Sequence, residues 1–282
     1  MTIEMSQTLA VKDGRHGQYL KVKSIDIDKL GQMASPICLF DDFRVSGRPF
    51  GPHPHAGFSQ ITYVLRDSIG GNRSRDSLGN DIVVAPGGIV WTQAANGMLH
   101  QEVPADPTHE LHGLQVFVNL SERHKFVAPR VLHLESACVP LWQSPDGDIV
   151  RVVVGSFGSV SSPLAPEEPF DFLDIELRDE IVFHLVQGRN AFVYVLQGRV
   201  SIISEEWEHE VSSGHAVALT GSGNLTFAAS SPSNFLILSG LDIREPVLAQ
   251  GPFIVNNRQQ LEDVLARYRA GEMGHLEPIS DR

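Results

Sequence analysis

The chain has 282 residues, 42% of them hydrophobic, and is therefore long enough to bury a large core. Its 34 acidic and 22 basic residues give a formal net charge of −12, which argues against direct contact with nucleic acid or an anionic membrane. Residues 1–12 lack the pattern of a signal peptide, and no apolar run approaches the length of about 18 residues that spans a bilayer. We therefore expect a cytoplasmic protein without membrane contact.

Two short motifs in the first half share an i, i+2 spacing. His53-Pro54-His55 comes first, and His100-Gln101-Glu102 follows. On a β-strand this spacing places both side chains on one face, so two facing strands would bring three imidazoles and a carboxylate to one point. Such a set is typical of a metal site. The alternative is that these histidines are solvated or hydrogen-bonded side chains beside prolines.

Short apolar runs separated by Gly, Pro, Asn and Asp recur through most of the chain. This spacing favours a β-sandwich or barrel over alternating strands and helices. The predicted strands are residues 61–65, 82–85, 89–92, 114–120, 149–154, 181–186, 191–196, 200–203, 216–219, 225–229 and 235–240.

Internal similarity indicates two barrels in tandem. The run Gln60–Asp67 parallels Ala191–Gly198, and the strand rhythm is interrupted by prolines between Ala128 and Asp148. We therefore predict one barrel in residues 1–135 and a second in residues 136–282. Because the second half has no His-x-His motif, we expect only the first barrel to bind metal.

One α-helix is predicted near the C-terminus, over residues 258–269. Asn257 is a suitable N-cap, and Gly271 follows the last turn. The apolar residues recur at the i, i+3, i+4, i+7 spacing of one helix face, namely Leu261, Val264, Leu265 and Tyr268. We expect this face to cover the protein core.

Several segments, in the same order along the chain, resemble the pirin family of bicupins. They are Phe50–Phe58, Arg75–Asn80, Ala85–Gly88, Trp91-Thr92, Asn96–Glu102, Gly113–Leu120 and Gln250–Asn257. The resemblance covers the chain from about Leu39 to Gly271. It implies an all-β fold of two stacked cupin barrels (the double-stranded β-helix or jelly roll), with the helix following at the C-terminus.

The resemblance also implies one mononuclear metal, usually Fe(II), in the N-terminal barrel. Its ligands at the matching positions are His53, His55, His100 and Glu102. Mn, Ni, Co, Cu and Zn are the alternative metals. The chain departs from the family at Ala56 and Ser59, where relatives carry Arg and Glu, and in residues 67–75, which lack a histidine that many relatives have. We expect these changes to alter the pocket and the choice of substrate.

Two classes of function remain open, an enzyme and a regulatory protein. Three neutral imidazoles and a carboxylate leave open positions on Fe(II) that suit O₂ or a bidentate oxygen substrate, and Glu102 could also act as a catalytic base for an enol or phenol proton. The family resemblance implies a dioxygenase of the quercetin 2,3-dioxygenase type, with an aromatic or enol substrate and O₂. The alternative is a non-enzymatic regulatory protein whose metal or redox state controls binding of a protein partner.

Overall fold

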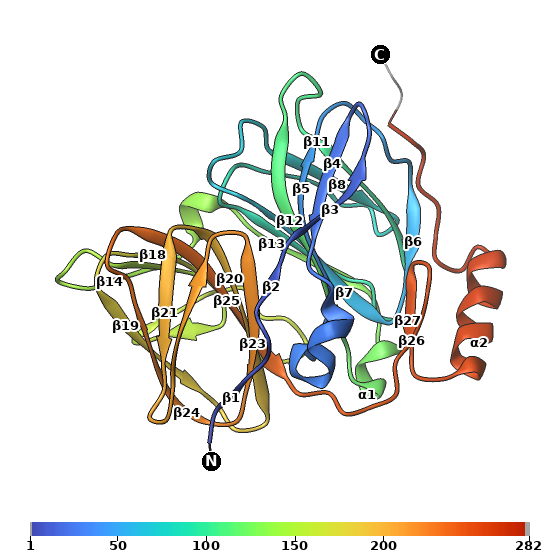
Figure 1. Ribbon diagram of the computed structural model, residues 1–282. Helices are drawn as coiled ribbons and strands as arrows, with labels where there is room; N and C mark the ends of the chain where they lie inside the picture. Colours follow the sequence, from blue (N-terminus) through green and yellow to red (C-terminus); the bar gives the residue numbers. More distant parts are fainter. Residues whose placement is uncertain (1, 280–282) are drawn as a thin grey trace. The chain divides into compact units, whose positions relative to one another are not determined.

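The computed structural model describes residues 2–279, which form two compact units built mainly of β-strands (Figure 1). The N-unit consists of Asp13–Ser24, Ile37–Ala137 and Ile243–Arg282, and the C-unit of Met1–Lys12, Ile25–Pro36 and Cys138–Asp242. Each unit thus takes chain segments from both halves of the sequence. The division predicted from the sequence, residues 1–135 and 136–282, stays a prediction.

The N-unit contains a seven-stranded and a four-stranded sheet. The larger sheet has the order β13 (Arg130–Leu134), β10 (Ile89–Gln93), β7 (Phe58–Val64), β12 (Leu111–Asn119), β5 (Ile37–Val45), β4 (Leu20–Ser24) and β3 (Lys12–His16). The smaller sheet has the order β6 (His53–His55), β11 (Met98–Pro104), β8 (Asn72–Asp76) and β9 (Asp81–Val84).

Apolar side chains from both sheets of the N-unit meet in one cluster. Val64 and Val90 come from the larger sheet and Val84 from the smaller one. Because alternate residues of a strand share a face, Gln60 and Thr62 of β7 point to the same side as Val64, into the space between the sheets. The interior of this unit therefore has an apolar part around Val64 and a polar part around Gln60 and Thr62.

The C-unit repeats this two-sheet arrangement. Its larger sheet has the order β1 (Glu4–Met5), β23 (His215–Thr220), β20 (Arg189–Gln197), β25 (Ser233–Leu241), β18 (Phe170–Leu177), β15 (Ile149–Val154) and β14 (Leu141–Gln143), with β2 (Leu9–Ala10) also paired to β23. The smaller sheet has the order β19 (Glu180–Leu185), β24 (Gly223–Ala228), β21 (Arg199–Ile203) and β22 (Glu208–Ser212). A hairpin, β16 (Ser156–Phe157) and β17 (Val160–Ser161), and the 3₁₀ helix η1 (Ile27–Ala34) complete it.

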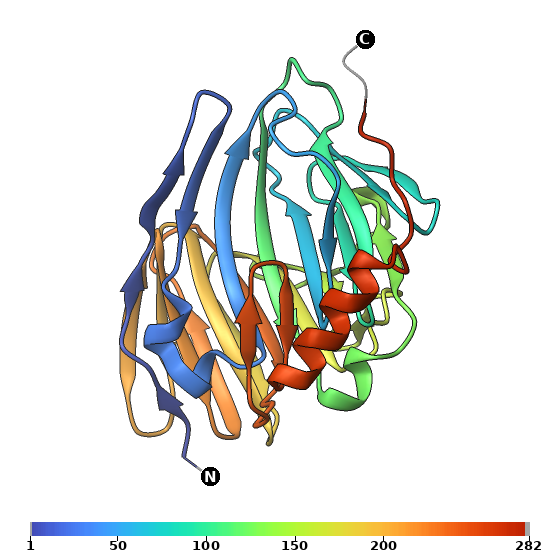
Figure 2. The same cartoon turned by 90° about the vertical axis from the view of Figure 1, so that its right-hand side faces the viewer.

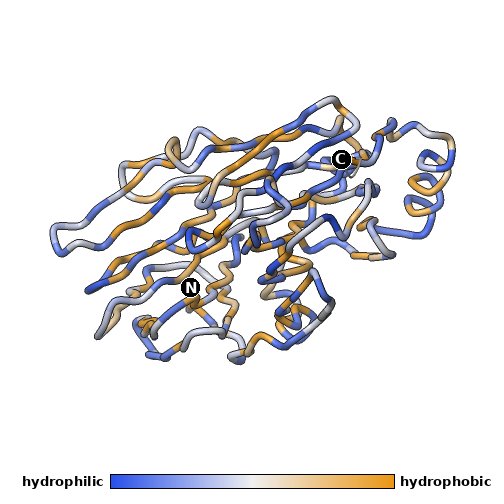
Figure 3. The backbone as a smooth tube through the Cα atoms, turned by 90° about the horizontal axis from the view of Figure 1, so that it is seen from above, coloured by the Kyte–Doolittle hydropathy of each residue, from blue (hydrophilic) through white to orange (hydrophobic). Residues whose placement is uncertain are grey.

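The interior of the C-unit is filled by apolar side chains. Phe183 and Phe227 of the smaller sheet pack in one cluster with Val193, Phe235 and Ile237 of the larger sheet. Along the described backbone, hydrophobic and hydrophilic stretches alternate, as expected for strands with one buried face (Figure 3). Among its described residues, this unit has no group of three His, Cys, Asp or Glu side chains that could hold a metal ion, in contrast to the N-unit.

The C-terminal helix predicted from the sequence is confirmed as α2 (Arg258–Arg269). Asn257 caps it, because its side-chain oxygen accepts a hydrogen bond from the backbone N–H of Gln260 at 3.0 Å. Leu261 and Val264 are buried against the hairpin of β26 (Leu248–Gln250) and β27 (Phe253–Val255), which lies beside the helix in Figure 2. A shorter helix, α1 (Glu122–Lys125), and a 3₁₀ turn, η2 (Ser136–Cys138), complete the described elements. Within residues 2–279, no helix is long and apolar enough to cross a membrane.

Replacing Leu261 by alanine should destabilise the N-unit. The side chain is buried in an apolar cluster, so its truncation is expected to lower the free energy of unfolding by about 2–5 kcal/mol. Urea unfolding measures the change. Glu262→Ala is the matched control, because Glu262 is exposed and its ion pair in the described structure is with the exposed Arg258. Equal stability of the two variants would contradict a structural role for the helix.

Candidate metal centre

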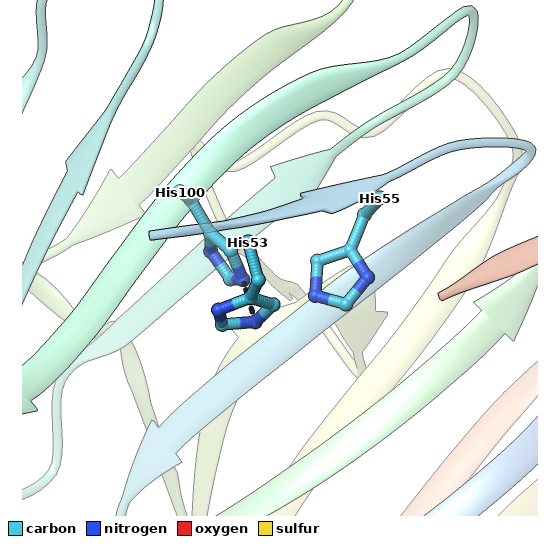
Figure 4. Close-up of side chains that lie close together, drawn as sticks. All are labelled: His53, His55 and His100. Carbon is cyan, nitrogen blue, oxygen red and sulfur yellow. Dashed lines mark hydrogen bonds between the residues drawn. The ribbon is translucent and has the colours of Figure 1, made fainter. Parts of the chain in front are cut away.

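His53, His55 and His100 converge because β6 and β11 are neighbours in exact register. Within this antiparallel pair His100 lies opposite His53, and Met98 lies opposite His55. The three ring centroids are 4.6–4.9 Å apart, and one nitrogen of each ring lies within 4.8 Å of the others (Figure 4). Among the described residues, this is the one group of three or more His, Cys, Asp or Glu side chains that could hold a metal ion.

Hydrogen bonding directs the nitrogens of His53 and His100 toward each other. Nδ1 of His53 lies 3.0 Å from the carbonyl oxygen of Gly51, which can only accept, so this nitrogen carries the proton. The lone pair of His53 is then on Nε2, which lies 3.1 Å from Nε2 of His100. A backbone carbonyl that fixes the tautomer of a histidine in this way is characteristic of metal ligands.

The ring nitrogens of His55 and His100 that lack a hydrogen-bond partner also fit a metal ion. Within the described part of the chain, neither nitrogen of His55 makes a hydrogen bond of normal geometry, and Nδ1 of His100 also lacks a partner. Leaving a buried polar group unpaired costs about 1–3 kcal/mol, and coordination would supply the missing interaction at His55.

Burial also keeps His55 and His100 in the neutral form that binds metal. It lowers the pKa of His55 to about 3, with the charge of His53 acting in the same direction and the Pro252 carbonyl opposing it. Burial likewise lowers the pKa of His100 well below its usual value, helped by the charges of the other two histidines. Protons therefore compete weakly with a metal ion at neutral pH.

Glu102 lies on the same strand as His100, but its carboxylate is held by three other side chains. Oε2 accepts hydrogen bonds from Nε2 of Gln60 at 2.8 Å and from the hydroxyl of Thr62 at 2.7 Å. Oε1 accepts one from Nδ2 of Asn72 at 2.9 Å. Burial raises the pKa of Glu102, and these three hydrogen bonds oppose that effect. The carboxylate is not part of the convergent histidine group, so its role as a fourth ligand stays a prediction.

Two aromatic rings pack against His55. The ring centroid of Phe58 is 5.1 Å away and that of Phe117 is 5.6 Å away, and the two phenyl rings are 4.5 Å apart. Phe117 lies opposite Gln60 in the register between β12 and β7, so it faces the same interior space. His53 and Phe117 are only partly buried, so solvent reaches this side of the histidine group.

The two departures from the family pattern differ in their placement. Ala56 packs with Phe253 and Leu261 in the cluster beneath α2, rather than beside the histidines. Ser59 is fully buried on the face of β7 opposite to Gln60. Ala56 therefore affects how the C-terminal hairpin and helix pack, and it does not line the histidine site.

Gln60, Thr62 and Asn72 were missed by the reasoning from sequence. A signal was present at two of them, because Gln60 and Thr62 are polar residues at alternate positions of a strand that is buried throughout. Buried polar side chains normally have a hydrogen-bonding partner, and here that partner is Glu102.

Comparison with known proteins gives the family. The model of the Pirin family matches residues 16–118, and that of the Pirin C-terminal cupin domain matches residues 172–274. Pirin from Rattus norvegicus is 31% identical over 251 residues, which are 86% of this chain and 84% of the rat protein. The chain belongs to the pirin family. The two cupin domains and the all-β fold expected from the sequence are thereby confirmed.

Solved structures support the same fold for this pirin. A crystal structure of quercetin 2,3-dioxygenase from Acinetobacter baumannii superposes with a TM-score of 0.83 and 22% identity, covering 97% of this chain and 99% of that one. A bacterial pirin from Escherichia coli, in complex with nickel(II), has a TM-score of 0.63 and 22% identity, covering 85% and 99% of the two chains.

Proposed function

We propose that this pirin is a metal-dependent dioxygenase of the quercetin 2,3-dioxygenase type, acting on a flavonol or enol with O₂ in the cytoplasm. The observation that carries the proposal is the convergence of three imidazoles on a side of the barrel that solvent reaches, with nitrogens of His55 and His100 that lack a hydrogen-bond partner among the described residues. The name of the Acinetobacter baumannii structure supports this reaction class.

His53, His55 and His100 would hold the metal, with Glu102 as the fourth ligand. Fe(II) is the expected ion, with Mn, Ni, Co, Cu and Zn as alternatives; the Escherichia coli pirin was solved with nickel(II). When bound, such an ion supplies open positions at which O₂ and a substrate oxygen can be held together.

Glu102 and the aromatic rings would prepare the substrate. Gln60, Thr62 and Asn72 fix the carboxylate of Glu102 in one orientation, so it can accept the proton of an enol or phenol hydroxyl without moving. The apolar faces of Phe58 and Phe117 lie beside His55 and would exclude water from a flat substrate ring.

Oxygen uptake tests the proposed function. Protein loaded with Fe(II) should consume O₂ when flavonols such as quercetin, or small enols, are added, and metal-free protein should not. An oxygen electrode measures the rate, and turnover on the order of 1–10³ s⁻¹ is expected for a true substrate. If no flavonol or enol supports uptake with Fe, Mn, Ni, Co, Cu or Zn, the function is instead that of a regulatory protein with a protein partner.

A further inference from the structure

Residues 271–279, here named the C-terminal strap, follow the outer side of the strand that carries His100. From the end of α2 the chain runs beside β6 in Figure 1. The strap makes contacts at Gly97, Ser77, Arg75 and Gln101, all of which belong to β11, β8 or the turns that border them. It thus reaches Gly97, just before β11, and Gln101, within β11, while Ser77 links it to the backbone of Leu99.

The first contact is between Met273 and Gly97, the residue just before β11. Met273 is buried, and a Cβ atom on Gly97 would lie only 2.6 Å from its terminal methyl group. Gly97 also has a positive φ of 120°, a backbone conformation that residues other than glycine rarely adopt. The turn before β11 therefore needs glycine for its conformation, and the end of the Met273 side chain packs directly on it.

The second contact runs through Ser77 to the residue before His100. The hydroxyl of Ser77 donates to the carbonyl oxygen of Met273 at 2.7 Å and accepts from the backbone N–H of Leu99 at 3.1 Å. The backbone N–H of Ser77 donates to the carbonyl oxygen of Leu99 at 2.9 Å. One side chain thus links the strap to the backbone beside a ligand.

The third contact involves Gln101, which stands between His100 and Glu102 in the sequence and points to the opposite face of β11. This buried side chain donates from Nε2 to the carbonyl oxygen of Phe50 at 2.9 Å, and its Oε1 accepts from the backbone N–H of Ile279 at 3.1 Å. Phe50 lies three residues before His53. A single amide therefore joins the segment before one ligand, the strand of another, and the strap.

Arg75 reinforces this end of the strap. It lies opposite Gln101 in the register between β8 and β11, and its guanidinium donates to the carbonyl oxygen of Glu277 at 3.2 Å. The bonds to Glu277 and Ile279 both use backbone atoms of the strap. Backbone hydrogen bonds therefore hold this end of the strap, whatever its side chains contribute.

We propose that the C-terminal strap holds β6 and β11 in register from outside the barrel and so slows metal exchange at the histidine group, with Gln101 as the positioning residue. The proposal rests on metal binding, which is part of the proposed function. Partners outside the ligand set commonly change metal affinity by about 10–100-fold, because they fix the orientation of the ligands. A segment held by a few hydrogen bonds also opens more readily than the sheet beneath it.

The test measures the rate at which metal-loaded protein gives up its ion to excess chelator. Three variants separate the contacts: Gln101→Ala removes both bonds of the amide, Ile279→Pro removes only the N–H of the strap, and Gln101→Glu keeps the acceptor for Ile279 but loses the donor to Phe50. We expect metal release to be about 10–100-fold faster in Gln101→Ala and intermediate in the other two. Hydrogen exchange should accelerate in β6 and β11.

Asn256→Ala is the matched control. Asn256 is also a buried amide of the N-unit, its Nδ2 donates to Glu245 at 2.9 Å, and neither residue belongs to β6 or β11. It should lower the melting temperature without changing metal release. If Gln101→Ala lowers the melting temperature but releases metal at the wild-type rate, the positioning role is wrong. If wild-type protein binds no metal, the proposed function itself fails, an outcome distinct from failure of the strap alone.

Discussion

Replacing His55 by alanine is expected to reduce metal content from near one ion per chain to less than about a tenth of that. His55 contributes the imidazole whose two nitrogens are both buried and lack hydrogen bonds of normal geometry in the described structure, so metal is the partner that this side chain fits. A site left with two imidazoles retains transition metals poorly, because mononuclear sites of this kind use three or four protein ligands. Elemental analysis of protein purified without chelator measures the loss.

The control for this prediction is His133→Ala. His133 lies on β13 of the same unit but is exposed, and it is not part of the convergent group. Its replacement should leave metal content unchanged. Full metal content in the His55→Ala variant would contradict the assignment of the site, and a wild-type content near two ions would reveal a second site.

The histidine group could be predicted from the sequence because its geometry is mostly local. The spacing of His53 and His55 fixes a shared face on any strand, and only the pairing of β6 with β11 had to be assumed. The hydrogen bonds to Glu102 could not be predicted in the same way. Gln60 and Glu102 are 42 residues apart and belong to different sheets, so their contact depends on how the two sheets pack.

The difference between local and long-range signals also explains why the helix could be predicted and the pairing of the N-terminal segment could not. The cap at Asn257 and the apolar spacing after it are local signals, and α2 begins where they indicate. Residues 1–12, by contrast, belong to the C-unit because β1 pairs with β23, where Glu4 lies opposite Thr220. A pattern of a few neighbouring residues does not specify a strand partner more than 200 residues away. The contacts of the strap with Gln101 could not be predicted from the sequence for the same reason.

The substitution Glu102→Gln should lower turnover of a flavonol or enol by about 10²–10⁴-fold, while metal content falls much less. The amide keeps the size of the carboxylate and one oxygen, so Gln60 and Thr62 can still donate to it. The new amide NH₂ would face Asn72, whose Oδ1 has no hydrogen-bond partner among the described residues and can turn to accept from it. The substitution therefore removes proton acceptance with little disturbance of the surrounding structure.

Thr62→Val separates the orientation of Glu102 from its charge. It removes one of the two hydrogen bonds to Oε2 and leaves the carboxylate able to accept a proton. Because a hydrogen bond to a charged group contributes about 1.5–3 kcal/mol, we expect turnover to fall by about 10–100-fold, less than in Glu102→Gln. Steady-state O₂ uptake and elemental analysis on both variants measure the two effects. Turnover near wild type in Glu102→Gln would leave Glu102 without a role as base, whereas parallel loss of metal and turnover would mean that the carboxylate acts mainly as a ligand.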